Sequence, residues 1–190
     1  MAEGDQTTHV DVPVYTMGYG ARTLEEFVAA LKGNEIEYLI DVRTAPFSKF
    51  KPEFSKELLQ HRLERADVKY VFMGDTLGGM PKQACCLTDG KVDYDKVRVQ
   101  PFFHAGLERV KQAFQQRRRI ALMCSEGRPE ECHRSKLIGQ ALIDAGVPVC
   151  HIDEDGALVP QREVIDRLTK GQMDLFGGPS LTSRKRYDVE

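Results

Sequence analysis

The sequence contains no tryptophan, no long apolar run and little net charge. No stretch approaches the roughly 18 apolar residues of a membrane-spanning helix, so we expect no membrane partner. The formal net charge of −2 gives no overall attraction to nucleic acid, so any basic site must be local. Residues 1–13 lack the basic and apolar regions of a secretory signal, which predicts a cytoplasmic protein.

Cysteine is also scarce. Its five copies are an odd number in a chain of 190 residues, unlike the paired cysteines of small secreted domains. We therefore expect free thiols in a reducing compartment. Hydrophobic residues make up 41% of the chain, which is enough for a core, and the length is typical of one domain.

Strand-like and helix-like patterns alternate along the chain. Amphipathic helical patterns separate five short runs rich in β-forming residues, at 14–17, 36–42, 68–73, 120–124 and 147–152. The alternation predicts an α/β fold, a single domain with a three-layer, parallel or mostly parallel sheet and helices on both faces. In such sheets, ligands bind at the carboxyl ends of the strands.

The predicted domain spans 13–170 and includes an irregular insertion loop at about 74–100. A flexible N-terminus, 1–12, and a flexible tail, 171–190, flank it. The tail contains the peptide QMDLF, which resembles the short peptide by which bacterial replication and repair proteins dock on the sliding clamp. Its anchors would be Gln172, Leu175 and Phe176. The alternative is that these side chains fold back onto the domain.

Polar or small residues follow the first two predicted strands. Gly18-Tyr19-Gly20 either presents backbone N–H groups to an anion or forms only a tight turn. Asp41 and Arg43 share one strand face, where they either bind substrate or form a partly buried ion pair. The loop 44–54 interleaves phenylalanines with lysines, as nucleic-acid grooves do, but we expect its aromatic rings to pack inward.

The segment that follows the fourth predicted strand is the strongest signal. Within eleven residues it gathers Cys124, Glu126, Cys132, His133 and Arg134. A cysteine beside histidine and arginine near a helix N-terminus has a lowered thiol pKa and is a candidate nucleophile. Glu126 is a candidate general base or a partner that orients His133, and Arg134 is a candidate anion ligand. The alternative is an apolar, buried cysteine and a helix-capping histidine.

A metal site is a minority alternative for the same segment. Cys124, Cys132 and His133, with Cys150 or His151, would supply four zinc ligands. The spacing lacks a C-x₂-C knuckle, and adjacent residues on one element diverge, so no cofactor is predicted. His151 ends the fifth predicted strand, and we expect it to face the site without a metal.

Taken together, these motifs resemble the bacterial and archaeal family catalogued as domain of unknown function 488. The resemblance runs from about Val14 to His151. Its pattern marks ten positions, namely Asp41, Arg43, Ser48, Gly78, Gly79, Cys124, Glu126, Cys132, His133 and Arg134. The first turn departs from the family's usual Gly-His-Ser. The family implies no particular activity. A weaker likeness to rhodanese-type domains, which also follow a cysteine loop with Arg-Ser, is an analogy only.

Three hypotheses follow. The first is a thiolate-dependent enzyme, a transferase or hydrolase, that acts on an anionic or nucleotide-like substrate at the carboxyl edge of the sheet. The second is a nucleic-acid-processing or DNA-repair accessory protein recruited by the sliding clamp. The third is a zinc-stabilised binding module.

Overall fold

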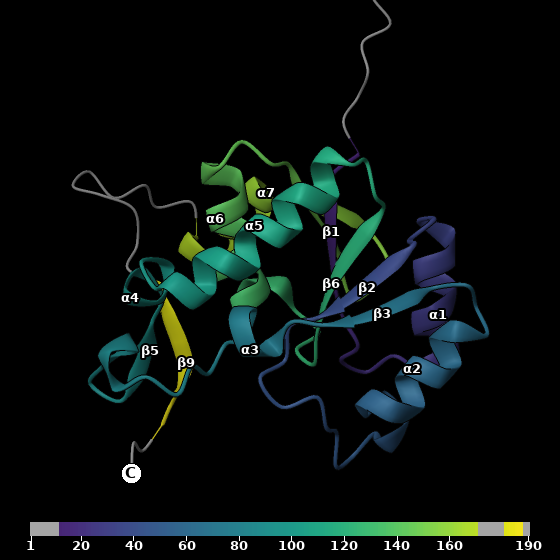
Figure 1. Cartoon of the computed structure of the whole chain (residues 1–190), viewed down its shortest axis with the longest axis horizontal. Coiled ribbons are helices and arrows are strands. Elements are labelled where there is room, and N and C mark those ends of the chain that lie inside the picture. The colour runs from purple at the N-terminus through teal and green to yellow at the C-terminus, as the bar shows by residue number, and fades with distance from the viewer. Residues whose placement is uncertain (1–11, 171–180, 188–190) are drawn as a thin grey trace, which may run out of the picture.

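The computed structural model describes residues 12–170 and 181–187. Its main sheet has six strands in the order β3-β2-β6-β1-β7-β8 (Figure 1). Their bounds are β1 (Val14–Gly18), β2 (Tyr38–Asp41), β3 (Lys69–Phe72), β6 (Ile120–Cys124), β7 (Val149–Ile152) and β8 (Leu158–Pro160). The first five are parallel to their neighbours and β8 is antiparallel to β7, so the predicted α/β fold with a mostly parallel sheet is confirmed.

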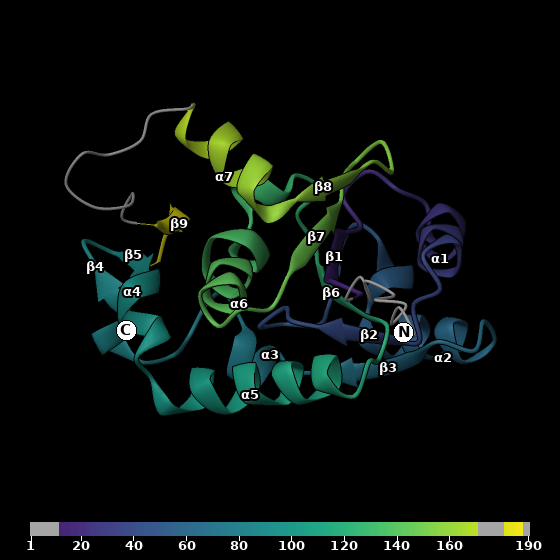
Figure 2. The same ribbon diagram turned by 90° about the horizontal axis from the view of Figure 1, so that it is seen from above.

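Alternate residues of the central strands belong to two separate apolar clusters. Met17 of β1 and Met123 of β6 pack in a cluster with residues of α1 (Leu24–Gly33) and α2 (Lys56–Glu64). Leu122 of β6 packs instead with residues of α5 (Pro101–Gln115) and α6 (Gln140–Asp144). Figure 2 shows α1 and α2 on one side of these strands and α5 and α6 on the other. The period-two alternation of strand side chains produces this division.

Local signals fix the helix that follows the first strand. The Thr23 hydroxyl accepts the backbone N–H of Glu26 at 3.2 Å, and the Glu26 carboxylate accepts the backbone N–H of Thr23 at 2.8 Å. This capping box satisfies two N–H groups that would otherwise have no helical partner. It holds the first residues of α1 directly after the turn at Gly18–Gly20.

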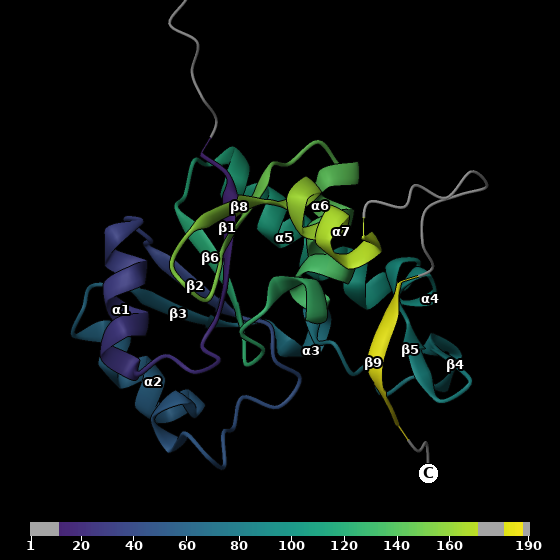
Figure 3. The same ribbon diagram turned by 180° about the vertical axis from the view of Figure 1, so that it is seen from behind.

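A second, smaller sheet joins the segment between β3 and β6 to the C-terminal part of the described chain. Within residues 74–100 lie α3 (Gly74–Leu77), η2 (Ala84–Cys86), β4 (Leu87–Thr88), β5 (Lys91–Asp93) and α4 (Tyr94–Arg98). The small sheet has the order β4-β5-β9, where β9 is Thr182–Arg186. Figure 3 shows β9 beside β5, away from the main sheet.

The position of β9 corrects the prediction of a flexible tail for residues 181–187. The Ser183 hydroxyl accepts the backbone N–H of Val92 at 2.9 Å, and the Tyr187 N–H donates to the carbonyl of Gly90 at 2.6 Å. Tyr187 also packs against the apolar cluster to which α5 and α6 contribute. The local sequence, Ser-Arg-Lys-Arg, carries no strand signal of its own, so only pairing with a distant strand orders it.

The remaining elements complete the path around the sheet. They are η1 (Pro52–Phe54), η3 (Pro129–Glu131), the π-helix η4 (Arg134–Gly139) and α7 (Gln161–Thr169). No helix in 12–170 or 181–187 combines the length and apolar character needed to cross a membrane. In the parallel register Gly18 pairs with Cys124 and Asp41 pairs with Met123, so three strands end at one edge.

Candidate active site

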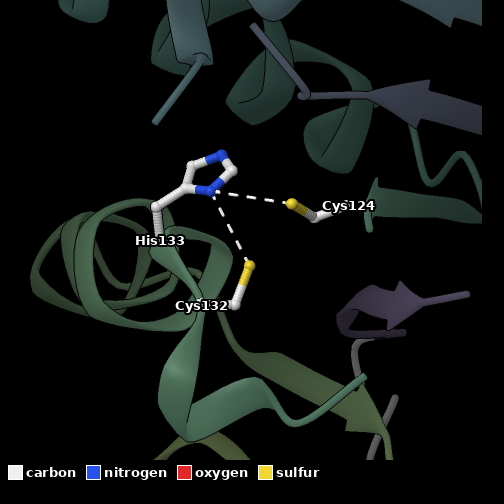
Figure 4. A group of neighbouring side chains, drawn as sticks. All are labelled: Cys124, Cys132 and His133. Carbon is white, nitrogen blue, oxygen red and sulfur yellow. Dashed lines mark hydrogen bonds between the residues drawn. The ribbon is translucent and has the colours of Figure 1, made fainter. Parts of the chain in front are cut away.

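Two thiols and an imidazole meet at the carboxyl edge of the sheet. The Sγ atoms of Cys124 and Cys132 and a ring nitrogen of His133 all lie within 4.8 Å of one another. Nδ1 of His133 is 3.8 Å from Sγ of Cys124 and 3.7 Å from Sγ of Cys132 (Figure 4). All three side chains are buried. The predicted clustering of these residues is thus present.

Backbone contacts determine where the three side chains lie. Cys124 is the last residue of β6, and Cys132 precedes η4, where its carbonyl accepts the N–H groups of Ser135 and Lys136 at 3.2 Å each. His133 follows immediately and turns its ring back toward β6. A Cβ on Gly79 would lie 2.7 Å from Cγ and Nδ1 of that ring. Gly79 therefore lets the backbone pack against the imidazole face.

One hydrogen bond sets the tautomer of His133. Its Nε2 lies 3.1 Å from the carbonyl oxygen of Val42. A carbonyl only accepts, so Nε2 carries the proton and donates it, which leaves Nδ1 of the neutral ring as an acceptor facing both sulfurs. The imidazole is thereby oriented as a base for either thiol.

The pKa values of the two thiols are shifted in opposite directions. A hydrogen bond from the Cys132 thiol, and then the positive charges of the His133 ring, once it has taken the proton, and of Arg134, hold the pKa of Cys124 well below its ordinary value in spite of burial. Burial, and then the hydrogen bond to Cys124 and its negative charge, raise the pKa of Cys132. The pair therefore releases its first proton easily and its second with difficulty, and the first leaves a thiolate on Cys124.

Arg134 has a different role from the predicted anion ligand. Its guanidinium is fully buried and donates to the carbonyl oxygens of Glu126 and Gly127, the latter at 2.6 Å, and to the Thr16 hydroxyl at 3.2 Å. Three acceptors from the protein occupy it, so it anchors the loop between the two cysteines. Its positive charge still acts on Cys124 through space.

The turn at Gly18-Tyr19-Gly20 likewise packs against this loop and binds no anion through its N–H groups. The N–H groups of Tyr19 and Gly20 donate to the carbonyls of Cys124 and Ser125 at 3.2 and 3.1 Å. A Cβ on Gly18 would lie 1.7 Å from the carbonyl oxygen of Glu126. The glycine is required for this close approach, and the tight-turn alternative is the correct one.

Asp41 and Arg43 form the ion pair that the sequence left as an alternative to substrate binding. The Arg43 guanidinium donates to both Asp41 oxygens, at 2.9 and 2.6 Å, and Tyr70 donates to Asp41 at 2.7 Å. Asp41 is fully buried and does not line the pocket, and its hydrogen bonds to the guanidinium position Arg43. Arg43 itself lines the pocket, and its Nη1 atom has no hydrogen-bond partner among the described residues.

His151 does not face the site. Its ring is buried between the Thr16 hydroxyl on Nδ1 and the Gln161 side-chain oxygen on Nε2, each at 2.6 Å. Burial lowers its pKa to about 4. Both ring nitrogens contact other parts of the protein and the residue does not line the pocket, so the expectation that it faces the site is wrong.

The pocket above the thiols has a volume of about 300 Å³, in the range of small-ligand sites. Sequence reasoning had identified Tyr19, Arg43, Gly79 and Glu126 among its walls, besides the three floor residues. It had not identified the side chains that close the opposite wall, namely Tyr94, Glu131, Ser183, Arg184, Lys185 and Tyr187. Arg184 bridges Glu126 at 3.0 Å and also contacts Glu131. The local sequence signal for this wall is the basic run Arg184-Lys185-Arg186, whose charges suit contact with phosphate.

Two other marked positions support the pocket without lining it. The Ser48 hydroxyl accepts the Tyr19 hydroxyl at 3.3 Å. A Cβ on Gly78 would lie 2.2 Å from the carbonyl oxygen of Gly74, so this glycine serves chain packing. The clamp-like residues Gln172, Leu175 and Phe176 lie outside the described residues.

The prediction that the aromatic rings of the loop 44–54 pack inward is correct for only one of its three phenylalanines. Phe54 is buried and stacks on Tyr19 at a centroid distance of 4.3 Å. Phe47 and Phe50, however, are 71% and 92% exposed, and Phe47 lines the pocket. Lysines lie between them in the sequence.

The thiol and imidazole set also has the composition of a soft-metal site. Cys and neutral His are the ligands that zinc prefers, and Nε2 of His133 is held by a backbone carbonyl, as metal-bound histidines usually are. The argument that neighbouring residues diverge was wrong for Cys132 and His133, whose ligand atoms converge. Cys150 and His151 are not members of this group among the described residues.

The sequence model of the family described as domain of unknown function DUF488 matches residues 23–140, which is more than half of the chain. The match covers the Asp41–Arg43 pair and the whole segment from Cys124 to Arg134, and it leaves out the first turn and His151. No curated protein and no solved structure matches this chain.

Proposed function

The chain belongs to the family of domain of unknown function DUF488, and from that premise we propose that it is an enzyme whose Cys124 thiolate attacks a small anionic or nucleotide-like substrate. One observation carries the proposal. Two thiols and a base with a fixed tautomer converge at the floor of a pocket of about 300 Å³. A nucleophile, a base and a group that orients the base are the parts of covalent catalysis by cysteine.

Proton transfer follows from the hydrogen bonds. Cys124 gives its proton to Nδ1 of His133, and the ring becomes an imidazolium whose Nε2–H still donates to Val42. The thiolate then attacks an electrophilic atom of the substrate, and the imidazolium returns the proton to the leaving group. Arg134 supports the thiolate by charge and fixes the loop at Glu126 and Gly127.

The pocket charges support an anionic substrate. Arg184 is paired with two glutamates, and Arg43 is paired with Asp41. Lys185 lines the pocket and forms no ion pair within the described ranges. We therefore propose Arg43 and Lys185 as the anion contacts and Glu126 as a residue that positions Arg184.

Matched electrophiles test this proposal. Iodoacetate and iodoacetamide differ mainly in charge, and peptide mass spectrometry measures the alkylation rate of each cysteine separately. We expect the rate ratio, iodoacetate over iodoacetamide, to be at least about tenfold higher at Cys124 than at the exposed Cys85, a difference of ~1.4 kcal/mol. Lys185→Gln should lower the ratio at Cys124 alone. An equal ratio at both cysteines would remove the anionic substrate from the proposal.

A second candidate function is a nucleic-acid-processing or DNA-repair accessory role. The exposed rings of Phe47, which lines the pocket, and of Phe50 in the same loop support it, because bases stack on such rings and lysines contact phosphates. Recruitment by the sliding clamp through Gln172, Leu175 and Phe176 stays a prediction. A labelled peptide spanning 170–178 should bind purified clamp saturably, and its Gln172→Ala, Phe176→Ala form should not.

The zinc-stabilised module is the third hypothesis. The convergence of Cys124, Cys132 and His133 supports it. Elemental analysis of the purified full chain distinguishes it from the thiolate enzyme. Zinc at one atom per chain, lost together with thermal stability on chelation, would favour the binding module. Full alkylation of Cys124 without added chelator would favour the enzyme.

A further inference from the structure

A second thiol lies beside the proposed nucleophile. The Sγ atoms of Cys124 and Cys132 are within 4.8 Å of each other, and both residues line the same pocket. A disulfide joins sulfurs about 2.05 Å apart, so a relative shift of under about 3 Å would join them. Group transfer through one cysteine requires no second thiol at this distance. The pair therefore points to chemistry in which both sulfurs take part.

The base is placed for both sulfurs. Nδ1 of His133 is 3.8 Å from Sγ of Cys124 and 3.7 Å from Sγ of Cys132, so one imidazole reaches either thiol without moving. Arg134 fixes the carbonyls of Glu126 and Gly127 in the loop that joins the two cysteines. The remaining cysteines, Cys85, Cys86 and Cys150, do not line the pocket.

We propose that Cys132 is a resolving cysteine and that the site reduces small disulfides that carry carboxylates, with Cys124 and Cys132 cycling between dithiol and disulfide. This inference rests on the proposed thiolate function and names its substrate class. A nucleophilic thiolate with a resolving thiol in reach is the arrangement that reversible thiol–disulfide exchange requires. Arg43 and Lys185, on the pocket wall, are the contacts for the carboxylates.

The Cys124 thiolate attacks one sulfur of the substrate disulfide, forms a mixed disulfide and expels the other half as a thiolate, which takes the proton of the His133 imidazolium. Cys132 then gives its proton to Nδ1 of His133, attacks Sγ of Cys124 and expels the second half, which is protonated in turn. The substrate gains two electrons and two protons, and the protein is oxidised to the disulfide. A reducing dithiol from solution restores the two thiols.

Stoichiometry with 5,5′-dithiobis(2-nitrobenzoate), a disulfide with a carboxylate on each half, tests the inference. The protein used is the full chain with the substitutions Cys85→Ser and Cys150→Ser, which remove two thiols outside the pocket. We expect this protein to release both halves of the probe as coloured thiolate and to yield a peptide pair linked through Cys124 and Cys132. With Cys132→Ser added, only one half should be released, and the other should stay on Cys124.

A stable probe adduct on Cys124 of the protein that retains Cys132 would overturn the inference, and so would first attachment at Cys132. Cys124→Ser supplies the matched control, since Cys132 alone should react at least about tenfold more slowly. The result separates the two proposals. Selective iodoacetate alkylation of Cys124 without formation of the disulfide retains the thiolate enzyme and rejects the resolving cysteine. Loss of the selective alkylation rejects both.

Discussion

His151 gives the protein a pH-dependent stability whose size follows from its hydrogen bonds. Its Nε2 faces the side-chain oxygen of Gln161, which only accepts, so in the neutral ring Nε2 carries the proton. Nδ1 then accepts the Thr16 hydroxyl, which itself accepts Nε–H of Arg134. Only the neutral ring satisfies both contacts, and a second ring proton would face a donor in a buried site.

The sign and magnitude follow from linkage. The ring has a pKa of about 4 in the folded chain against its ordinary 6.5, so the unfolded state binds the proton first as pH falls. The neutral ring therefore contributes stability above pH 6.5, and the contribution is lost as pH falls toward 4. At 1.36 kcal/mol per unit, the full loss is about 3 kcal/mol, of which about 2 kcal/mol is gone by pH 5.

Urea unfolding between pH 7.5 and 4.5 measures this loss. Carboxylates also titrate in this range, so the informative quantity is the difference between wild type and His151→Gln, which lacks the titration. The exposed His61→Gln is the matched control and should follow wild type. Where His151→Gln does not fold, ring-proton NMR of the wild type gives the pKa directly. Parallel curves for wild type and His151→Gln, or a ring that titrates near 6.5, would refute the reasoning.

Two further substitutions test the site. Gly79→Ala places a methyl group 2.7 Å from the His133 ring, so alkylation of Cys124 should slow at least about tenfold, whereas Gly33→Ala, with nothing within 4 Å, should leave it unchanged. Arg184→Gln should change the free energy of unfolding by less than ~1 kcal/mol, because exposed ion pairs contribute little. It should nevertheless lower the iodoacetate rate at Cys124, because it leaves Glu126 and Glu131 on the pocket wall without their positive partner. A large destabilisation by Arg184→Gln, or normal alkylation in Gly79→Ala, would contradict these contacts.

The sequence was sufficient to predict the five parallel strands of the main sheet and the floor of the site, but not the antiparallel strand β8. Parallel strands end at one edge, so residues after β6 had to gather there, and Cys124, Cys132 and His133 do so. Whether a polar residue at this edge faces the ligand or the protein depends on which acceptors surround it. Arg134 and His151 were misassigned for this reason, because carbonyls and side chains from distant segments enclose them.

The missed wall of the pocket has a different cause. Arg184 and Lys185 reach the site only because β9 pairs with β5, some ninety residues earlier in the chain, and no local pattern announces that pairing. The local pattern likewise does not distinguish the exposed rings of Phe47 and Phe50 from the buried ring of Phe54 in the same loop. That the chain is one domain in three layers stays a prediction.

The pH dependence of Cys124 alkylation is the most direct measurement of the central claim. It is followed peptide by peptide in metal-free, full-length protein, with Cys150, whose thiol pKa is raised by burial, as the internal comparison. We predict a midpoint for Cys124 well below the ~8.5 of an unperturbed thiol, because Cys132, His133 and Arg134 stabilise its thiolate. A midpoint at or above that of Cys150 would contradict the thiolate, and with it the proposed enzyme.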